Sequence, residues 1–208
     1  MAKYDGERIT HGRVVNYLLD KFPQYEAAST VDSYIIGVTP FLQSQYGDPG
    51  DGDCTLCSIM TWIYHYCGGK TNDQVIYAYV RKHAKDYFYN NTIGTIPFFA
   101  KTIFNKTLKS LKINRKINSY YCKGIGYTLG KIKNAIKKDI PVVFSVTTDG
   151  RNYYKSHTIT IIGYETFRLQ KQGLRDKDVT MLVVYDNWSK VYSYVDLDKV
   201  SVLSSIYF

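Results

Sequence analysis

The chain has 208 residues, of which 45% are hydrophobic and 22% are charged, and its formal net charge is +9. This length suits one domain with a sizeable core, or at most two small ones, and the composition is that of an ordinary globular protein. No apolar run approaches the roughly 18 residues that a membrane-spanning helix needs, so we predict no membrane span.

Much of the positive charge falls between residues 101 and 138, where lysines and an arginine recur with no acidic residue among them. A surface of this kind attracts anionic partners such as nucleic acid, anionic lipid and teichoic-type cell-wall polymers. No signature of a nucleic-acid-binding module accompanies the charge, so a specific nucleic-acid partner is not expected. An anionic cell-wall polymer stays a candidate partner, and a solvated basic face is the simpler interpretation.

The first half of the chain has helical patterns. Apolar residues at helical spacing predict four helices: residues 11–22, Cys54 to the stop at Gly68-Gly69, a helix capped by Thr71 or Asn72, and a helix opened by Pro97. An extended segment, residues 33–43, and a loop rich in glycine and aspartate, residues 47–53, lie between the first two helices.

The second half changes character. Thr128 caps a further amphipathic helix, which Pro141 ends. Apolar and alternating runs then predict strands at residues 141–146, 156–165, 180–188, 192–200 and 201–208. A helical half followed by a mostly antiparallel sheet predicts an α+β fold.

Two of the four cysteines, Cys54 and Cys57, lie in the segment GDGDCTLCSIMTW at the start of a predicted helix. A zinc site would need a second close pair or a cysteine–histidine cluster, so no metal site is predicted. A core of this size needs no disulfide scaffold. A thiolate is favoured at a helix N-terminus and beside an imidazole, so each cysteine is either a nucleophile or a small buried core residue.

A nucleophilic cysteine needs a base and a group that orients the base. His157 opens the predicted strand SHTITIIGY, where the first residue can project into a cleft, and the other histidines are expected on exposed or distant helical faces. Asp186 closes the apolar strand VVYDNW, and Trp188 follows it as a candidate shield against water. Each alone has a plainer interpretation as a core, surface or turn residue. The order cysteine, histidine, aspartate over this distance favours a catalytic site.

These segments resemble the motifs of papain-like cysteine peptidases. GDCTLCSIMT is similar to G-x-C-G-S-C-W-A-F-S, SHTITIIGY to N-H-A-V-x-x-V-G-Y, and YDNW to K-N-S-W with aspartate in place of the orienting asparagine. That aspartate, with VTPFLQ, DCTLCS and IKKDIPVVFSV in order, is closer to the bacterial branch of bacteriocin-processing, double-glycine peptidases, the C39-like branch. The resemblance covers Tyr34 to the C-terminus, which implies an N-terminal helical extension over 1–33 and a papain-like peptidase domain over 34–208.

The resemblance also implies which cysteine attacks. Aligned on the bacterial branch, Cys54 is the nucleophile, because it follows Asp53 and has Ser58 four residues further on, although Thr55-Leu56 replace the Gly-Pro of that branch. Aligned on papain itself, Cys57 is the nucleophile and Cys54 a disulfide cysteine. The orienting aspartate and the segment IKKDIPVVFSV favour Cys54.

The remaining roles follow from the same resemblance. His157 is expected to be the base, Asp186 the group that orients it, and Gln43 the oxyanion donor, with Gln45 close enough to compete. The expected function is a cysteine peptidase that hydrolyses peptide or protein substrates through a Cys-His-Asp site, with no metal or cofactor.

Two alternatives stay open. A cell-wall amidase, deamidase or transglutaminase uses the same three residue types, and an inactive peptide-binding module would hold peptides through a tyrosine-rich surface. Intact cysteine, histidine and aspartate argue against the inactive module. The N-terminus has no apolar signal core, and a removed signal would leave the same sequence. If a signal has been removed, we expect a secreted or cell-surface protein of a bacterium.

Overall fold

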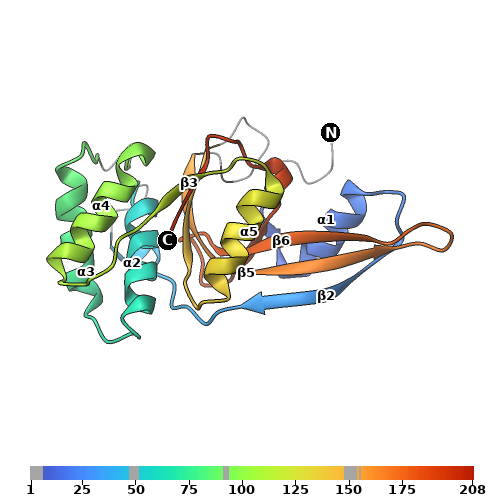
Figure 1. Ribbon diagram of the computed structural model, residues 1–208, viewed down its shortest axis with the longest axis horizontal. Coiled ribbons are helices and arrows are strands. Elements are labelled where there is room, and N and C mark those ends of the chain that lie inside the picture. The colour runs from blue at the N-terminus through green and yellow to red at the C-terminus, as the bar shows by residue number, and fades with distance from the viewer. Residues whose placement is uncertain (1–6, 47–51, 91–93, 148–153, 155) are drawn as a thin grey trace.

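The computed structural model describes residues 7–46, 52–90, 94–147, 154 and 156–208. In these residues, three helices gather at one end of the molecule, and a twisted antiparallel sheet extends from them to the other end (Figure 1). Two further helices, α1 (Val14–Lys21) and α5 (Ile125–Ile136), pack on the sheet. The predicted α+β organisation, a helical lobe packed on an antiparallel sheet, is confirmed.

The helical lobe consists of α2 (Cys54–Tyr66), α3 (Asp73–Lys85) and α4 (Pro97–Ser110). Residues 55–63 of α2 are all buried, because α3 and α4 pack against this helix from one side and β4 and β5 from the other. The side chain of Asn72 caps α3, and Pro97 occupies the first turn of α4, as their sequence positions predict. The central helix α2 thus begins at the junction of the two lobes.

The sheet has the strand order β1-β7-β6-β5-β4-β8-β3, with β2 paired to β5, and every pairing is antiparallel. Its strands are β1 (Ile9–Thr10), β2 (Ala27–Ile35), β3 (Ser119–Tyr121), β4 (Val142–Val146), β5 (His157–Gln170), β6 (Lys177–Tyr185), β7 (Ser193–Val195) and β8 (Ser205–Tyr207). β5 and β6 form a long hairpin that points away from the helical lobe (Figure 1). The near end of this hairpin, at His157 and Tyr185, therefore lies beside that lobe.

Several boundaries differ from the sequence prediction. The segment 1–33, expected to be a helical extension, contributes β1 and most of β2 to the sheet as well as α1. α5 begins at Ile125 after Gly124, which has a φ of 85°, and Thr128 lies inside the helix as a buried residue. β3 has no counterpart in the prediction, because three residues at a sheet edge carry too little pattern to stand out.

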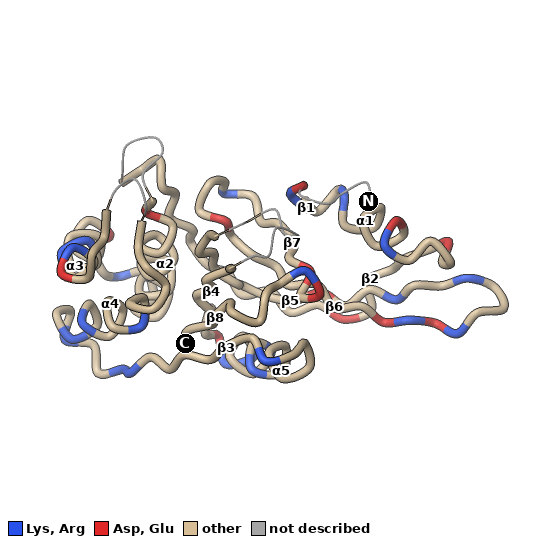
Figure 2. Tube along the Cα trace, turned by 90° about the horizontal axis from the view of Figure 1, so that it is seen from above, with Lys and Arg blue, Asp and Glu red and all other residues tan. Residues whose placement is uncertain are grey.

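The basic residues of segment 101–138 follow α4, the connection to β3 and α5 along one edge of the molecule (Figure 2). Some of their ammonium groups lie over tyrosine rings, with Lys106 at 4.8 Å from the centre of Tyr87 and Lys131 at 4.7 Å from that of Tyr120. Such cation–π contacts hold some of these lysine side chains against the protein surface. Within the described segments, no helix has the length and apolar character needed to cross a membrane.

Candidate active site

Cys54 is the first residue of α2, and it is partly exposed. Cys57, one turn further along, is fully buried. Burial above all, with the nearby charges of Asp53 and Cys54, raises the pKa of the Cys57 thiol well above its ordinary value. All four cysteines are free thiols. Of the two cysteines at the helix start, Cys54 is the one that a substrate can reach.

His157 opens β5, and the packing of α2 on β5 brings it to Cys54. Burial is the largest single influence on the Cys54 thiol and by itself would raise its pKa. The hydrogen bond with His157 and the charge of that ring act in the opposite direction, helped by hydrogen bonds from the Thr158 backbone and the Thr55 side chain. Together they lower the pKa of Cys54 below its ordinary value, which is the electrostatic signature of an activated thiol.

Asp186 follows β6 and contacts His157 through its main chain. Nε2 of His157 lies 2.7 Å from the carbonyl oxygen of Asp186. The carboxylate, which was expected to make this contact, has other partners: Oδ1 accepts the backbone N–H groups of Trp188 and Ser189, both at 3.2 Å, and Oδ2 lies 2.6 Å from Nε of Arg8. Because Nε2 must donate to a carbonyl, Nδ1 is the ring nitrogen left for Cys54.

Trp188 stacks on His157. The two ring centres are 4.1 Å apart with an angle of 22° between the planes, and Tyr154 packs beside both rings at 5.9 Å and 6.0 Å. Trp188 is still 49% exposed, so it is no core tryptophan. The indole covers one face of the imidazole at the surface of the molecule.

Asn187 ties the nucleophile helix to the sheet. Its Nδ2 lies 2.9 Å from the carbonyl oxygen of Cys54, 2.8 Å from Oγ of Ser58 and 2.8 Å from the carbonyl oxygen of Thr158. The residue is fully buried with a φ of 63°, a left-handed conformation that asparagine tolerates better than most side chains. One amide group thus fixes the start of α2 against β5.

Hydroxyl groups add a second link between the lobes. Oγ1 of Thr55, in the first turn of α2, is 2.8 Å from Oγ1 of Thr158 in β5. Oγ of Ser145 in β4 lies 3.1 Å from the same Thr158 hydroxyl. These buried contacts join the residues that follow Cys54 and His157, so they set the spacing of that pair.

The two candidate oxyanion donors differ in their surroundings. The side chain of Gln45 is used locally, because its Oε1 accepts the backbone N–H of Leu42 at 3.0 Å. The backbone N–H of Gln43 donates to the carbonyl oxygen of Asn187 at 2.9 Å. Gln43 is therefore held at the turn that also carries Asp186 and Trp188.

Asp53, the residue before the nucleophile, is fully buried, and its side chain makes no capping bond to α2. An aspartate in this position commonly accepts the N–H groups of the first helical turn. Here its carboxylate accepts the phenol of Tyr77, at 2.8 Å, and that of Tyr89. The start of α2 therefore keeps its N–H groups free of a side-chain cap, where an oxyanion can bind.

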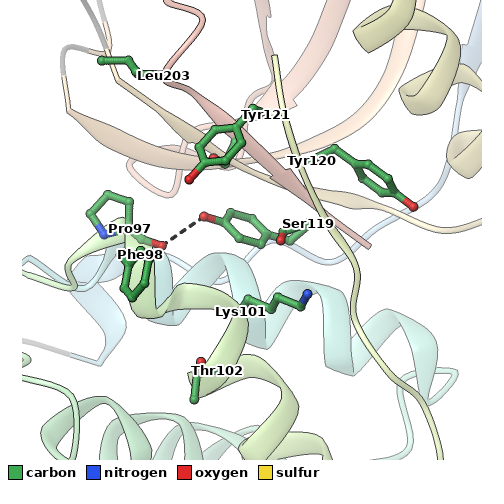
Figure 3. A pocket seen from close by; sticks show the side chains of 10 residues that line it. Pro97, Phe98, Lys101, Thr102, Ser119, Tyr120, Tyr121 and Leu203 are labelled. Carbon is green, nitrogen blue, oxygen red and sulfur yellow. Dashed lines mark hydrogen bonds between the residues drawn. The ribbon is translucent and has the colours of Figure 1, made fainter. Parts of the chain in front are cut away.

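A cavity of about 480 Å³ lies between the helical lobe and the edge of the sheet. Figure 3 shows Pro97 and Phe98 of α4 on one side of it and Tyr121 and Leu203 on the other. Ser205 of β8 also lines it and pairs with Ser145 of β4, the strand next to β5. One strand thus separates this aromatic cavity from the strand that carries His157.

The model of the Peptidase C39-like family matches residues 35–202 of the chain. The chain belongs to this family. The resemblance to papain-like, C39-type cysteine peptidases is thereby confirmed, and the helical lobe on its antiparallel sheet is the papain-like fold of this C39-like protein. No curated protein matches the chain.

Sequence reasoning missed three residues of this C39-like site. Asn187 follows Asp186 and Thr158 follows His157, so the only sequence signal for either residue is its position next to a motif residue. Arg8 offered no signal, because it lies far outside the motifs. In the part of the chain that the structure describes, no group of three or more histidine, cysteine or acidic residues has the arrangement to hold a metal ion.

Proposed function

We propose that this C39-like protein hydrolyses peptide bonds, with Cys54 as the nucleophile and His157 as the group that takes and returns the proton. The observation that carries the proposal is the partly exposed Cys54 thiol at the start of α2, which the packing of α2 on β5 places beside His157 and whose pKa that imidazole lowers. A thiolate at this position is stabilised by the positive end of the helix and by the adjacent imidazolium.

The reaction proceeds in two acyl-transfer steps. The Cys54 thiolate attacks the carbonyl carbon of the scissile bond, and the electron pair of the C=O double bond moves to the oxygen. The backbone N–H of Cys54 and the side chain of Gln43 stabilise this oxyanion. His157 protonates the leaving amine as the C–N bond breaks and a thioester remains. His157 then deprotonates a water molecule, which attacks the thioester, releasing the acid and the thiol.

Asp186 is the third member of the proposed site, as a positioning residue. Its carbonyl oxygen accepts the Nε2 proton of His157, which directs Nδ1 toward Cys54. The neighbouring indole of Trp188 limits the access of water to that hydrogen bond. The aromatic cavity beside β8 suits apolar side chains of a peptide substrate.

The test is cleavage of a mixed peptide library, read by mass spectrometry. Wild-type protein and Cys57→Ala should generate new peptide termini, and Cys54→Ala should generate none; thermal unfolding checks that all three are folded. Peptidoglycan is the second substrate, and cleavage confined to its amides would assign a cell-wall amidase instead. If neither the peptide library nor peptidoglycan is cleaved and the Cys54 thiol is unreactive, the protein is a binding module.

A further inference from the structure

Arg8 reaches the site from outside the region that matches the family, which begins at residue 35. It directly precedes β1, and the pairing of β1 with β7 brings it to the turn between β6 and β7. Its Nε lies 2.6 Å from Oδ2 of Asp186, and its Nη2 donates to the carbonyl oxygen of Val191 at 2.8 Å. One guanidinium group therefore holds both ends of the turn 186–191.

The carboxylate that Arg8 contacts is completely buried, whereas the Arg8 side chain is 23% exposed. A buried carboxylate needs a paired cation or several hydrogen bonds to stay ionised. In the described part of the chain, Arg8 is the cation that lies within ion-pair distance of Asp186. The remaining support comes from the N–H groups of Trp188 and Ser189, which are bonds within the turn itself.

This turn presents three groups to the reacting residues. They are the carbonyl oxygen of Asp186 on His157, the amide of Asn187 on the start of α2, and the indole of Trp188 on the imidazole. Each depends on the backbone path of the turn. A guanidinium that fixes its two ends therefore controls all three contacts without touching a substrate.

We propose that Arg8 is a positioning residue of the active site: by clamping the turn 186–191, it turns the Asp186 carboxylate away from His157 and presents the Asp186 carbonyl in its place. The inference rests on the proposed peptidase function. On this proposal, a residue that precedes the family-matched region contributes to the geometry of the active site.

The first test measures the alkylation rate of Cys54 by iodoacetamide as a function of pH, in wild type, Arg8→Ala, Arg8→Lys and Arg13→Ala. Arg13 is a matched control, since it is exposed and pairs with Glu7. Arg8→Ala should shift the alkylation profile to higher pH, Arg8→Lys should shift it less, and Arg13→Ala should match wild type. Millimolar methylguanidinium should restore the Arg8→Ala profile, which a general loss of stability would not allow.

The second test measures kcat and KM on a cleaved peptide. Arg8→Ala should lower kcat by about 10²-fold with little change in KM, the loss expected when reacting groups are displaced by about 1 Å. If Arg8→Ala has the kcat and the pH profile of alkylation of wild type, and only its melting temperature is lower, then Arg8 merely anchors β1. A higher kcat would make it an inhibitory clamp, which also overturns the proposal. If Arg8→Ala does not fold, Arg8→Lys decides on the same readouts.

The two tests also separate this inference from the proposed function. If wild-type Cys54 is unreactive and no peptide is cleaved, the peptidase function fails whatever Arg8 does. If wild type is active and Arg8→Ala equals it on both readouts, only the role of Arg8 fails.

Discussion

The carbonyl oxygen of Asp186 lies 2.7 Å from Nε2 of His157, so the main chain at Asp186 orients the imidazole. A main-chain acceptor survives any substitution of the side chain. The carboxylate does not contact His157; it accepts hydrogen bonds from the backbone N–H groups of Trp188 and Ser189 and so stabilises the turn. Substitutions at this position therefore report on the shape of the turn.

Asp186→Asn and Asp186→Ala should differ in severity. Asparagine retains an oxygen for the N–H groups of the turn but loses the charge that faces Arg8. The rate constant kcat should therefore fall by about ten-fold, which corresponds to about 1.4 kcal/mol of lost transition-state stabilisation. Alanine loses both and leaves Arg8 unpaired, so kcat and the unfolding midpoint should both fall further, with KM little changed. Steady-state kinetics and thermal unfolding measure this. Equal activity in wild type and Asp186→Ala would show that the carboxylate of Asp186 is not needed to shape the turn.

Limiting iodoacetamide at neutral pH should alkylate Cys54 ahead of the other thiols. The pKa of Cys54 is lowered, whereas burial raises the pKa of Cys57 beyond the usual range and that of Cys122 to about 11. A lowered pKa means that the thiolate persists as the pH falls below the ordinary thiol range, so alkylation of Cys54 should persist there too. Peptide mapping identifies the modified residue.

Replacing His157 supplies the control for this profile. His157→Gln removes the hydrogen bond and the charge that lower the Cys54 pKa, so half-maximal alkylation should move to higher pH. Preferential labelling of Cys57 in wild type would show that the alignment on papain itself identifies the nucleophile.

The two tryptophans should respond oppositely to phenylalanine. Trp188 is half-exposed on His157, so Trp188→Phe should lower kcat and narrow the pH–rate profile with little change in stability. Trp62 is fully buried among the helices, so Trp62→Phe should destabilise the protein by about 1–3 kcal/mol and leave kcat per folded molecule unchanged. Denaturant unfolding and kinetics on both variants decide the matter. An unaltered pH–rate profile in Trp188→Phe would discard the shielding role.

Loss of the phenols around Asp53 should affect both stability and the nucleophile. Tyr77→Phe and Tyr89→Phe each leave the buried carboxylate one donor short, at a cost of about 1–3 kcal/mol. In the double variant the carboxylate can turn to the start of α2, where its charge raises the pKa of Cys54. Alkylation profiles and denaturant unfolding test this. Tyr25→Phe is the control, since its phenol donates an exposed hydrogen bond to the carbonyl oxygen of Arg175. An unchanged alkylation profile of Cys54 in the double variant would refute the predicted effect of the Asp53 charge on the Cys54 pKa.

The sequence predicts the elements that carry strong periodicity. The helix that begins at Cys54, the strand that begins at His157 and the strand that ends at Tyr185, just before Asp186, follow from long apolar runs. The finer geometry depends on contacts between distant segments. The main-chain contact of Asp186 leaves no trace in residue type, because every residue has a carbonyl group. Asn187 is visible in the sequence as the neighbour of Asp186, but its contacts with Cys54 and Thr158 depend on how distant segments pack.

The short strands β1 and β3 illustrate the same limit. The three residues Ser119–Tyr121 become a strand because β8, which lies within the predicted strand 201–208, pairs with them. Their own propensity contributes little, since tertiary pairing decides whether so short a segment is extended. Arg8 shares this property, because β1 places it at the site through pairing with β7.

The strand order also has a consequence for biosynthesis. Ile9 pairs with Tyr194, and β8 fills the position between β4 and β3, so the sheet is incomplete until residues 205–207 have left the ribosome. Pairings between such distant segments make folding slow relative to helical proteins of similar size. During synthesis, the nascent chain therefore carries Cys54 long before the turn 186–191 and β7 exist to complete its surroundings. The proposed active site is therefore one of the last parts of the molecule to form.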